Sequence, residues 1–129
     1  MSVERTLVII KPDAQERGLI GRIISRIEDK YLRITGAALL QKDDEWYGKM
    51  YPHLRLHGDM VYDDNKIFML SAPLLGLVVV GEDAVYAVRE IVAVIRHDFA
   101  TLPCRYNCIH ASTENAEQEI SLFFGEQNA

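Results

Sequence analysis

The sequence predicts an α+β fold in which helices cover a four-stranded sheet. Three observations support this prediction. Four strand-sized apolar runs occur, patterns with helical spacing lie between them, and the composition is ordinary for a globular protein, with 49% apolar and 26% charged residues. The order is strand, helix, strand, helical insert, strand, helix, strand, helix. This order fits the ferredoxin-like βαββαβ arrangement, with a four-stranded antiparallel sheet and additional helices.

The first strand, helix and strand are predicted from the N-terminal third of the chain. Residues Thr6 to Ile10 form a β-branched apolar run that stops at a turn around Pro12, because proline cannot continue a strand ladder. From Gly18 to Lys30, leucine and isoleucine recur every three or four positions, which is typical of an amphipathic helix. A second strand is predicted from Leu32 to Lys42, and Gly36 indicates a bulge in it.

The middle of the chain predicts a helical insert and a buried strand. The pair Asp43-Asp44 can cap a helix that ends near Pro52. The segment from His53 to Asn65 has no clean period, so we expect helical turns and loop that cover a site. A short helix from Lys66 to Ser71 follows. Residues Leu74 to Val80 are apolar throughout, as expected for a strand that is buried on both faces.

The C-terminal third predicts a helix, the last strand and the last helix. Residues Gly81 to Asp83 can cap a helix with a buried apolar stripe. The stripe consists of Val85, Val88, Ile91, Val92 and Ile95. A strand from Cys104 ends near His110. The last helix runs from about Thr113 to Phe124 and stops at Gly125, a residue that commonly follows a helix.

Length, charge and cysteine spacing narrow the class of protein. With 129 residues, the chain is expected to form one domain over residues 1–129. A net charge of −5 argues against a nucleic-acid binder, which needs a basic surface. There is no signal-peptide pattern and no apolar run of about 20 residues, so we expect a cytoplasmic protein without a membrane span. Cys104 and Cys108 lie about 13 Å apart in one predicted strand, which favours free thiols over a disulfide.

A histidine near the end of the last predicted strand is the candidate nucleophile. His110 is followed by the acidic start of a helix, where backbone N–H groups can point at an anion. A lone histidine in such a place is more often a surface or packing residue, so other residues must support the assignment. If the Glu119 carboxylate bonded to one ring nitrogen, it would fix the tautomer and leave the other nitrogen free to attack.

Phosphoryl transfer needs mainly positioning and positive charge around the moving group. Lys11 follows the first strand directly and is the first candidate cation. Arg89 and Arg96 are seven residues apart, so on one continuous helix both guanidinium groups would face the same cleft. The alternative interpretation of each cation is a solvated surface charge. The other histidines are interpreted as polar loop residues: His53, His57 and His97.

Several stretches of the chain together resemble the nucleoside diphosphate kinase family. Residues 4–14 (ERTLVIIKPDA) and 17–28 (RGLIGRIISRIE) resemble its N-terminal signature. Residues 107–112 (NCIHAS) resemble its active-site motif, whose histidine becomes transiently phosphorylated. Residues 115–124 (NAEQEISLFF) are similar to the last helix of the family. The resemblance covers nearly the whole chain.

The resemblance implies a ping-pong transfer of the γ-phosphoryl group from ATP or another nucleoside triphosphate to a nucleoside diphosphate. His110 would carry the phosphoryl group, and Glu119 would orient the His110 imidazole. The implied nucleotide and phosphate contacts are Lys11, Tyr51, Arg89, Arg96 and Asn107. Mg²⁺ would bridge the phosphates of the nucleotide rather than bind in a protein cage. A homo-oligomer built from dimers is also implied.

The chain departs from the family pattern in three places. The family usually has a longer connection between Arg89 and Arg96, which holds a phosphate-contacting threonine and helps to assemble subunits. The link from His110 to Glu119 is also shorter than usual. No aromatic shelf for the base is obvious, although Tyr62 is a candidate. Two other hypotheses therefore stay open: a nucleotide-binding regulatory pseudoenzyme with weak or no transfer, and a relay that passes the phosphoryl group to protein.

The spacing of Asn107 and His110 predicts a break in the last strand. Residues three positions apart point to opposite faces of a regular strand. Both side chains can line one pocket only if the strand ends between them, and we expect that it does.

Overall fold

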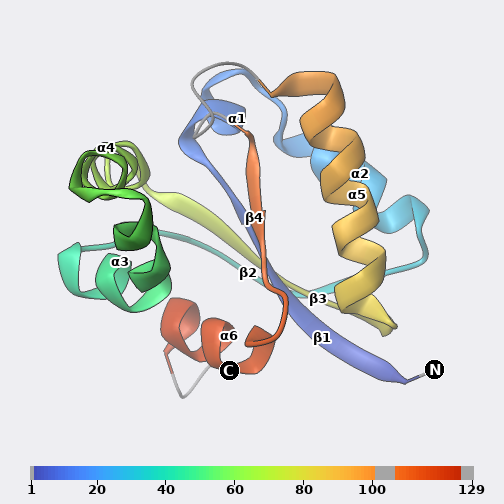
Figure 1. Ribbon diagram of the computed structural model, residues 1–129. Coiled ribbons are helices and arrows are strands. Elements are labelled where there is room, and N and C mark those ends of the chain that lie inside the picture. The colour runs from blue at the N-terminus through green and yellow to red at the C-terminus, as the bar shows by residue number, and fades with distance from the viewer. Residues whose placement is uncertain (1, 101–106, 126–129) are drawn as a thin grey trace.

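The structure, a computed structural model, describes residues 2–100 and 107–125. Its centre is a four-stranded antiparallel sheet, and helices pack on both faces of the sheet (Figure 1). The strands are β1 (Val3–Ile10), β2 (Arg33–Leu40), β3 (Leu74–Glu82) and β4 (Ile109–Ala111). The helices are α1 (Pro12–Glu16), α2 (Ile20–Asp29), α3 (Asp44–Met50), the 3₁₀ helix η1 (Pro52–His57), α4 (Asp59–Met69), α5 (Ala84–Phe99) and α6 (Ala116–Phe124).

The order of the strands across the sheet is β2-β3-β1-β4. Strand β1 therefore lies inside the sheet and pairs antiparallel with both β3 and β4. This topology confirms the predicted α+β fold of the ferredoxin-like βαββαβ type. The register of β2 against β3 shifts between Ile34 and Gly36, which confirms the predicted bulge.

Alternating side chains of β1 divide the interior into two hydrophobic cores. Val8 and Ile10 belong to a core shared with α2 and α5. Leu7 and Ile9 belong to a core shared with α3, α4 and α6. All four side chains are fully buried, and burial of such a side chain stabilises a fold by about 1.5–3 kcal/mol. The two faces of one strand thus hold both layers of helices.

The helical insert is more regular than the sequence indicates. Helix α3 begins as predicted, because the Asp43 carboxylate accepts a hydrogen bond from the backbone N–H of Trp46 at 3.0 Å. Helices η1 and α4 fill most of the segment for which helical turns and loop are predicted, and the predicted separate helix from Lys66 is the end of α4. Apolar side chains that stay exposed obscure the helical period here. They are Leu56, Met60, Val61 and Ile67.

Three boundaries differ from the predictions. Helix α1 begins at Pro12, where the sequence predicts a turn, because proline is well tolerated in the first helical turn. Strand β4 begins only at Ile109, later than predicted, and it ends at Ala111, next to His110 as predicted. The predicted start of that strand, Cys104 to Tyr106, lies outside the described residues. Helix α6 begins at Ala116, a few residues later than predicted.

Helix α5 is continuous over 16 residues and carries the predicted apolar stripe. Within that stripe Val85 is only half-buried, and Ala84 is fully buried in its place. Cys108 is a buried free thiol, as predicted. Among the described residues, no helix has the length and apolar content that a membrane span requires.

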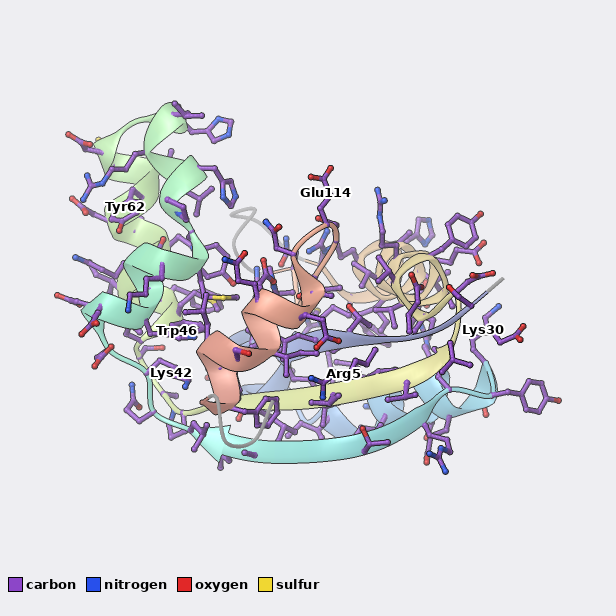
Figure 2. All side chains as sticks on the ribbon, turned by 90° about the horizontal axis from the view of Figure 1, so that it is seen from below. Arg5, Lys30, Lys42, Trp46, Tyr62 and Glu114 are labelled. Carbon is purple, nitrogen blue, oxygen red and sulfur yellow. The ribbon has the colours of Figure 1, made fainter. Side chains whose placement is uncertain are left out.

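Helix α6 is fixed on the sheet by a ring that fits over a glycine. The buried Phe123 ring packs edge-on against Trp46, with centroids 6.1 Å apart. Lys42 donates a hydrogen bond to the Phe123 carbonyl oxygen, and its Nζ lies 4.5 Å from the centroid of the ring. Figure 2 shows Lys42 and Trp46 beside the C-terminal end of α6. A Cβ atom at Gly76 of β3 would lie 2.2 Å from the ring, so only glycine permits this contact.

We predict that Gly76→Ala destabilises the protein by about 1–3 kcal/mol, because the buried ring must move to accommodate the methyl group. Chemical unfolding in urea measures this loss. Gly21→Ala is the matched control, since a Cβ atom at Gly21 in α2 meets nothing within 4 Å. Equal stability of the two variants would contradict the proposed close contact.

Candidate active site

A pocket of about 420 Å³ opens between the helical insert, α5 and the start of β4. This volume is within the range of small-molecule sites in proteins. The pocket brings together five of the residues predicted from sequence: Lys11, Tyr51, Arg96, Asn107 and His110. The segments that supply them lie far apart in the sequence, so the tertiary fold alone assembles the group.

His110 is the central residue of β4 and lies opposite Ile9 of β1. Directly opposed residues share a face of the sheet, so the imidazole lies on the side of α3 and α6. Its Nε2 is 2.9 Å from Oε1 of Glu119 on α6. An ionised carboxylate can only accept, so Nε2 carries the proton and Nδ1 keeps its lone pair. The arrangement is that of an oriented nucleophile.

The Glu119 carboxylate stays ionised although it is largely buried. Burial is the largest single influence and raises its pKa. The hydrogen bonds from His110 and Ser112, together with the charges of His110 and His53, bring the pKa below its ordinary value. The Ser112 hydroxyl donates to the same Oε1 at 2.5 Å. The charge of Glu119 therefore holds the histidine tautomer at neutral pH.

The backbone breaks at Cys108, between Asn107 and His110. Cys108 has a φ of 75°, and the N–H of Ile109 donates to the Asn107 carbonyl oxygen at 2.9 Å. Together these describe a γ-turn, a strained conformation for a residue other than glycine. The turn lets both Asn107 and His110 line the pocket. The predicted break is confirmed, although β4 begins after the break rather than ending before it.

Asp13 of α1 and Lys11, which precedes that helix, both form hydrogen bonds with this turn. The buried Asp13 carboxylate accepts from the Cys108 N–H at 3.0 Å. The Lys11 N–H donates to the Cys108 carbonyl oxygen at 2.8 Å. Both backbone groups of the strained residue are thus satisfied, at a position where the chain could not remain extended.

Lys11 presents an unusual cation to the pocket. Its Nζ donates to the Asn107 side-chain oxygen at 2.7 Å, and the residue is only 7% exposed. Burial, followed by repulsion from Arg96, lowers the pKa of Lys11 to about 8, while Asp13 and Cys108 oppose the change. Lys11 therefore begins to lose its charge in mildly alkaline solution.

Of the two predicted arginines, only Arg96 reaches the pocket. Its guanidinium donates to the Ile109 carbonyl oxygen at 2.9 Å, and burial lowers its pKa. Arg89 is exposed and does not line this pocket, so the expectation that both face one cleft is wrong. Seven residues of helix restore the angle but separate the two side chains by about 10 Å along the axis. The pocket lies at the Arg96 end of α5.

Tyr51 covers the imidazole. Its ring meets the His110 ring edge-on, with centroids 5.5 Å apart. The hydroxyl is buried and has no hydrogen-bond partner within the described part of the chain. Burial raises the pKa of Tyr51, so the hydroxyl keeps its proton. Buried hydroxyls without a partner are uncommon in proteins.

Sequence reasoning expected the segment from His53 to Asn65 to cover a site, but it named none of the residues that form one wall of the pocket. This wall comes from η1 and α4 and consists of His53, Leu54, Val61, Asp64 and Asn65. His53 in particular was interpreted as a polar loop residue. Tyr62, the candidate base shelf, is buried beneath Arg55 and does not line the pocket. The helical period of this segment is weak, so the sequence does not indicate which of its residues face the pocket.

Comparisons with known proteins point to one family. A family model described as nucleoside diphosphate kinase matches residues 4–129. The chain is 42% identical to the nucleoside diphosphate kinase of Roseiflexus sp. strain RS-1, over 95% of this chain and 88% of that protein. It is 41% identical to the Staphylococcus aureus strain JH9 enzyme of the same name, over 96% of this chain and 89% of that one.

Solved structures of the same name have a similar fold. The Aquifex aeolicus nucleoside diphosphate kinase aligns with a TM-score of 0.84 at 33% identity, covering 98% of this chain and 99% of that chain. The Halobacterium salinarum enzyme, solved in complex with CDP, gives 0.81 at 35% identity, with 98% and 91% covered. From the family model, the identity and the shared fold it follows that this chain belongs to the nucleoside diphosphate kinase family.

Proposed function

We propose that the chain transfers the γ-phosphoryl group of a nucleoside triphosphate to a nucleoside diphosphate through a phosphohistidine on His110. The observation that carries the proposal is the bond between His110 Nε2 and Glu119, which leaves Nδ1 unprotonated beside the pocket. The Nδ1 lone pair attacks the γ-phosphorus. The bond between the γ-phosphorus and the oxygen that bridges it to the β-phosphate breaks, and its electron pair leaves with the nucleoside diphosphate. A terminal oxygen of the β-phosphate of the second nucleotide then attacks the phosphorus. The bond between phosphorus and Nδ1 breaks, and its electron pair returns to the His110 imidazole.

The charged and polar groups around His110 have distinct roles in this scheme. Lys11 and Arg96 neutralise charge on the phosphate oxygens during transfer. The Tyr51 side chain and the Asn107 amide contact the nucleotide. Lys11 Nζ already donates a hydrogen bond to Asn107, so these two side chains are held in place before the nucleotide binds. Arg89 has no part in the mechanism as we propose it.

Magnesium fits this site as a partner of the nucleotide. Within residues 2–100 and 107–125, no group of three or more histidine, cysteine or acidic side chains is placed to hold a metal. Mg²⁺ would therefore enter with the nucleotide and would supply positive charge next to its phosphates. Lys11 and Arg96 would bind the phosphate oxygens that the metal leaves free.

Assembly and location are proposed from the family resemblance. We expect a homo-oligomer built from dimers in the cytoplasm. In the family, the longer connection between the positions of Arg89 and Arg96 helps to assemble subunits, so its shortening here affects the number of subunits. Light scattering on the purified chain measures that number.

Incubation with γ-labelled ATP tests the reaction. We predict that the label appears on the protein and moves to an added nucleoside diphosphate, and that His110→Ala abolishes both steps. His97→Ala is the control, because His97 is 88% exposed and outside the pocket. Full transfer by His110→Ala would refute the mechanism. Nucleotide binding without label would favour the regulatory pseudoenzyme, and label passing only to protein would favour the relay.

Glu119→Gln tests the orienting carboxylate. We predict that His110 becomes phosphorylated about 10–100 times more slowly, because a neutral amide no longer fixes the tautomer. Rapid quenching after mixing with labelled ATP measures the rate. Glu114→Gln is the matched control on an exposed position before α6. Similar rates in the two variants would show that Glu119 does not orient the imidazole.

The pKa of Lys11 predicts a pH dependence. Protonated Lys11 binds phosphate, so kcat/KM should be highest below the folded-state pKa of about 8 and fall as the pH rises through it. Lys11→Arg should move that fall to higher pH, because arginine keeps its proton. Steady-state rates between pH 6 and 10 provide the measurement, and an unshifted profile in the variant would assign the fall to another group.

A further inference from the structure

Asp13 is a buried acid to which the proposed transfer assigns no role. It lies in α1, two residues after Lys11, and only 8% of it is exposed. One carboxylate oxygen accepts from the Cys108 N–H at 3.0 Å. The other, Oδ1, is buried and has no hydrogen-bond partner among the residues that the structure describes. Burying a carboxylate with an unpaired oxygen is costly, so its presence at this position needs an explanation.

The hydrogen bond to Cys108 does not by itself explain the charge of Asp13. A neutral amide of the same size, or a serine hydroxyl, can also accept from one backbone N–H. The other polar group of Cys108, its carbonyl oxygen, is already bound by the backbone N–H of Lys11. The turn at Cys108 therefore requires an acceptor at position 13, but it does not require an anion.

The surroundings of Lys11 explain the anion. Lys11 is nearly as buried as Asp13, and its Nζ donates to the neutral side-chain oxygen of Asn107. The charge of Arg96 repels the ammonium, whereas the charge of Asp13 attracts it, although the two do not form a direct ion pair. A desolvated lysine beside a second cation gives up its proton readily unless an anion lies near it.

The other titratable groups around Lys11 do not supply this negative charge. Burial is the largest of the influences that raise the pKa of the Cys108 thiol to about 11, so the thiol keeps its proton in the range where Lys11 titrates. The titratable groups that line the pocket beside Lys11 and Arg96 are Tyr51, His53, Asp64 and His110. Tyrosine and histidine bring no negative charge near neutral pH, and the α4 carboxylate does not contribute to the pKa of Lys11. Within the described part of the chain, Asp13 is thus the anion that acts on Lys11.

We propose that Asp13 is a positioning residue for the transfer: its buried carboxylate is the counter-charge of Lys11 and also the acceptor that holds the turn at Cys108. The proposal rests on the proposed function in one respect, namely that the phosphates of the nucleotide bind at Lys11. Asp13 itself does not line the pocket. It acts through Lys11 and through the turn that places Asn107 beside the ammonium.

Calorimetric titration of the full chain with the magnesium salt of ADP, between pH 7 and 10, tests the proposal. The phosphates of ADP are ionised over this range, so a loss of affinity reports on the protein. In the unaltered chain the affinity should fall as the pH rises through about 8, where Lys11 loses its proton. Asp13→Asn keeps the size of the side chain and the acceptor but removes the charge, so the fall should move to lower pH.

Further variants separate the charge of Asp13 from its structural role. Glu16→Gln is the matched control, because Glu16 is exposed on the same helix and outside the pocket, and it should leave the profile unchanged. In a Lys11→Arg background, Asp13→Asn should not move the fall, since arginine keeps its proton. Asp13→Ser also lacks the charge and gives the same readout should the asparagine variant fail to fold.

Two results would overturn the proposal. One is a fall that stays at the same pH in Asp13→Asn. The other is a loss of affinity of the same size at every pH, since Asp13 would then only support the turn. Binding is measured without transfer, so the two proposals can fail separately. A shifted profile without label on His110 would remove only the transferase, and labelling with an unshifted profile would remove only the role of Asp13.

Discussion

The hydrogen bond between His110 and Glu119 is the interaction on which the site depends, and most of the fold serves to form it. It joins the middle of β4 to α6. The histidine faces α6 because it lies opposite Ile9, which points to the same core. Helix α6 reaches the sheet because Gly76 leaves room for the Phe123 ring. A packing constraint at a glycine thus sets the distance between a nucleophile and its orienting carboxylate.

Strain at Cys108 is the second constraint. Its positive φ is unfavourable for a residue other than glycine, by about 1–3 kcal/mol. Asp13 and the Lys11 backbone bind both polar groups of Cys108, so the surrounding structure maintains the turn. The strained residue places Asn107 beside Lys11 while His110 remains in the strand. The segment after β1 therefore contributes both a cation and the support for the turn that positions its partner.

Electrostatics in the pocket follow from the same compact arrangement. Arg96 lies close enough to Lys11 to help lower its pKa. Lys11 is largely withdrawn from water, whereas Arg96 stays partly exposed. Neither cation forms an ion pair with a residue that the structure describes, so both can attract an anion. Lys11 and Arg96 thus supply the positive charge of the pocket that His110 also lines.

The sequence by itself determined the strands, the amphipathic helices and the need for a break between Asn107 and His110, because periodicity and strand geometry are local properties. Its motifs also pointed to His110 and Glu119, and the structure places them in contact. Only the tertiary structure decided which arginine reaches the pocket, since a helical wheel gives the angle of Arg89 but not its distance along α5. It also decided which side chains of η1 and α4 line the pocket, because exposed apolar residues obscure the helical period of that segment. Contacts such as Lys11 with Asn107, 96 residues apart, arise from chain packing, which local patterns do not encode.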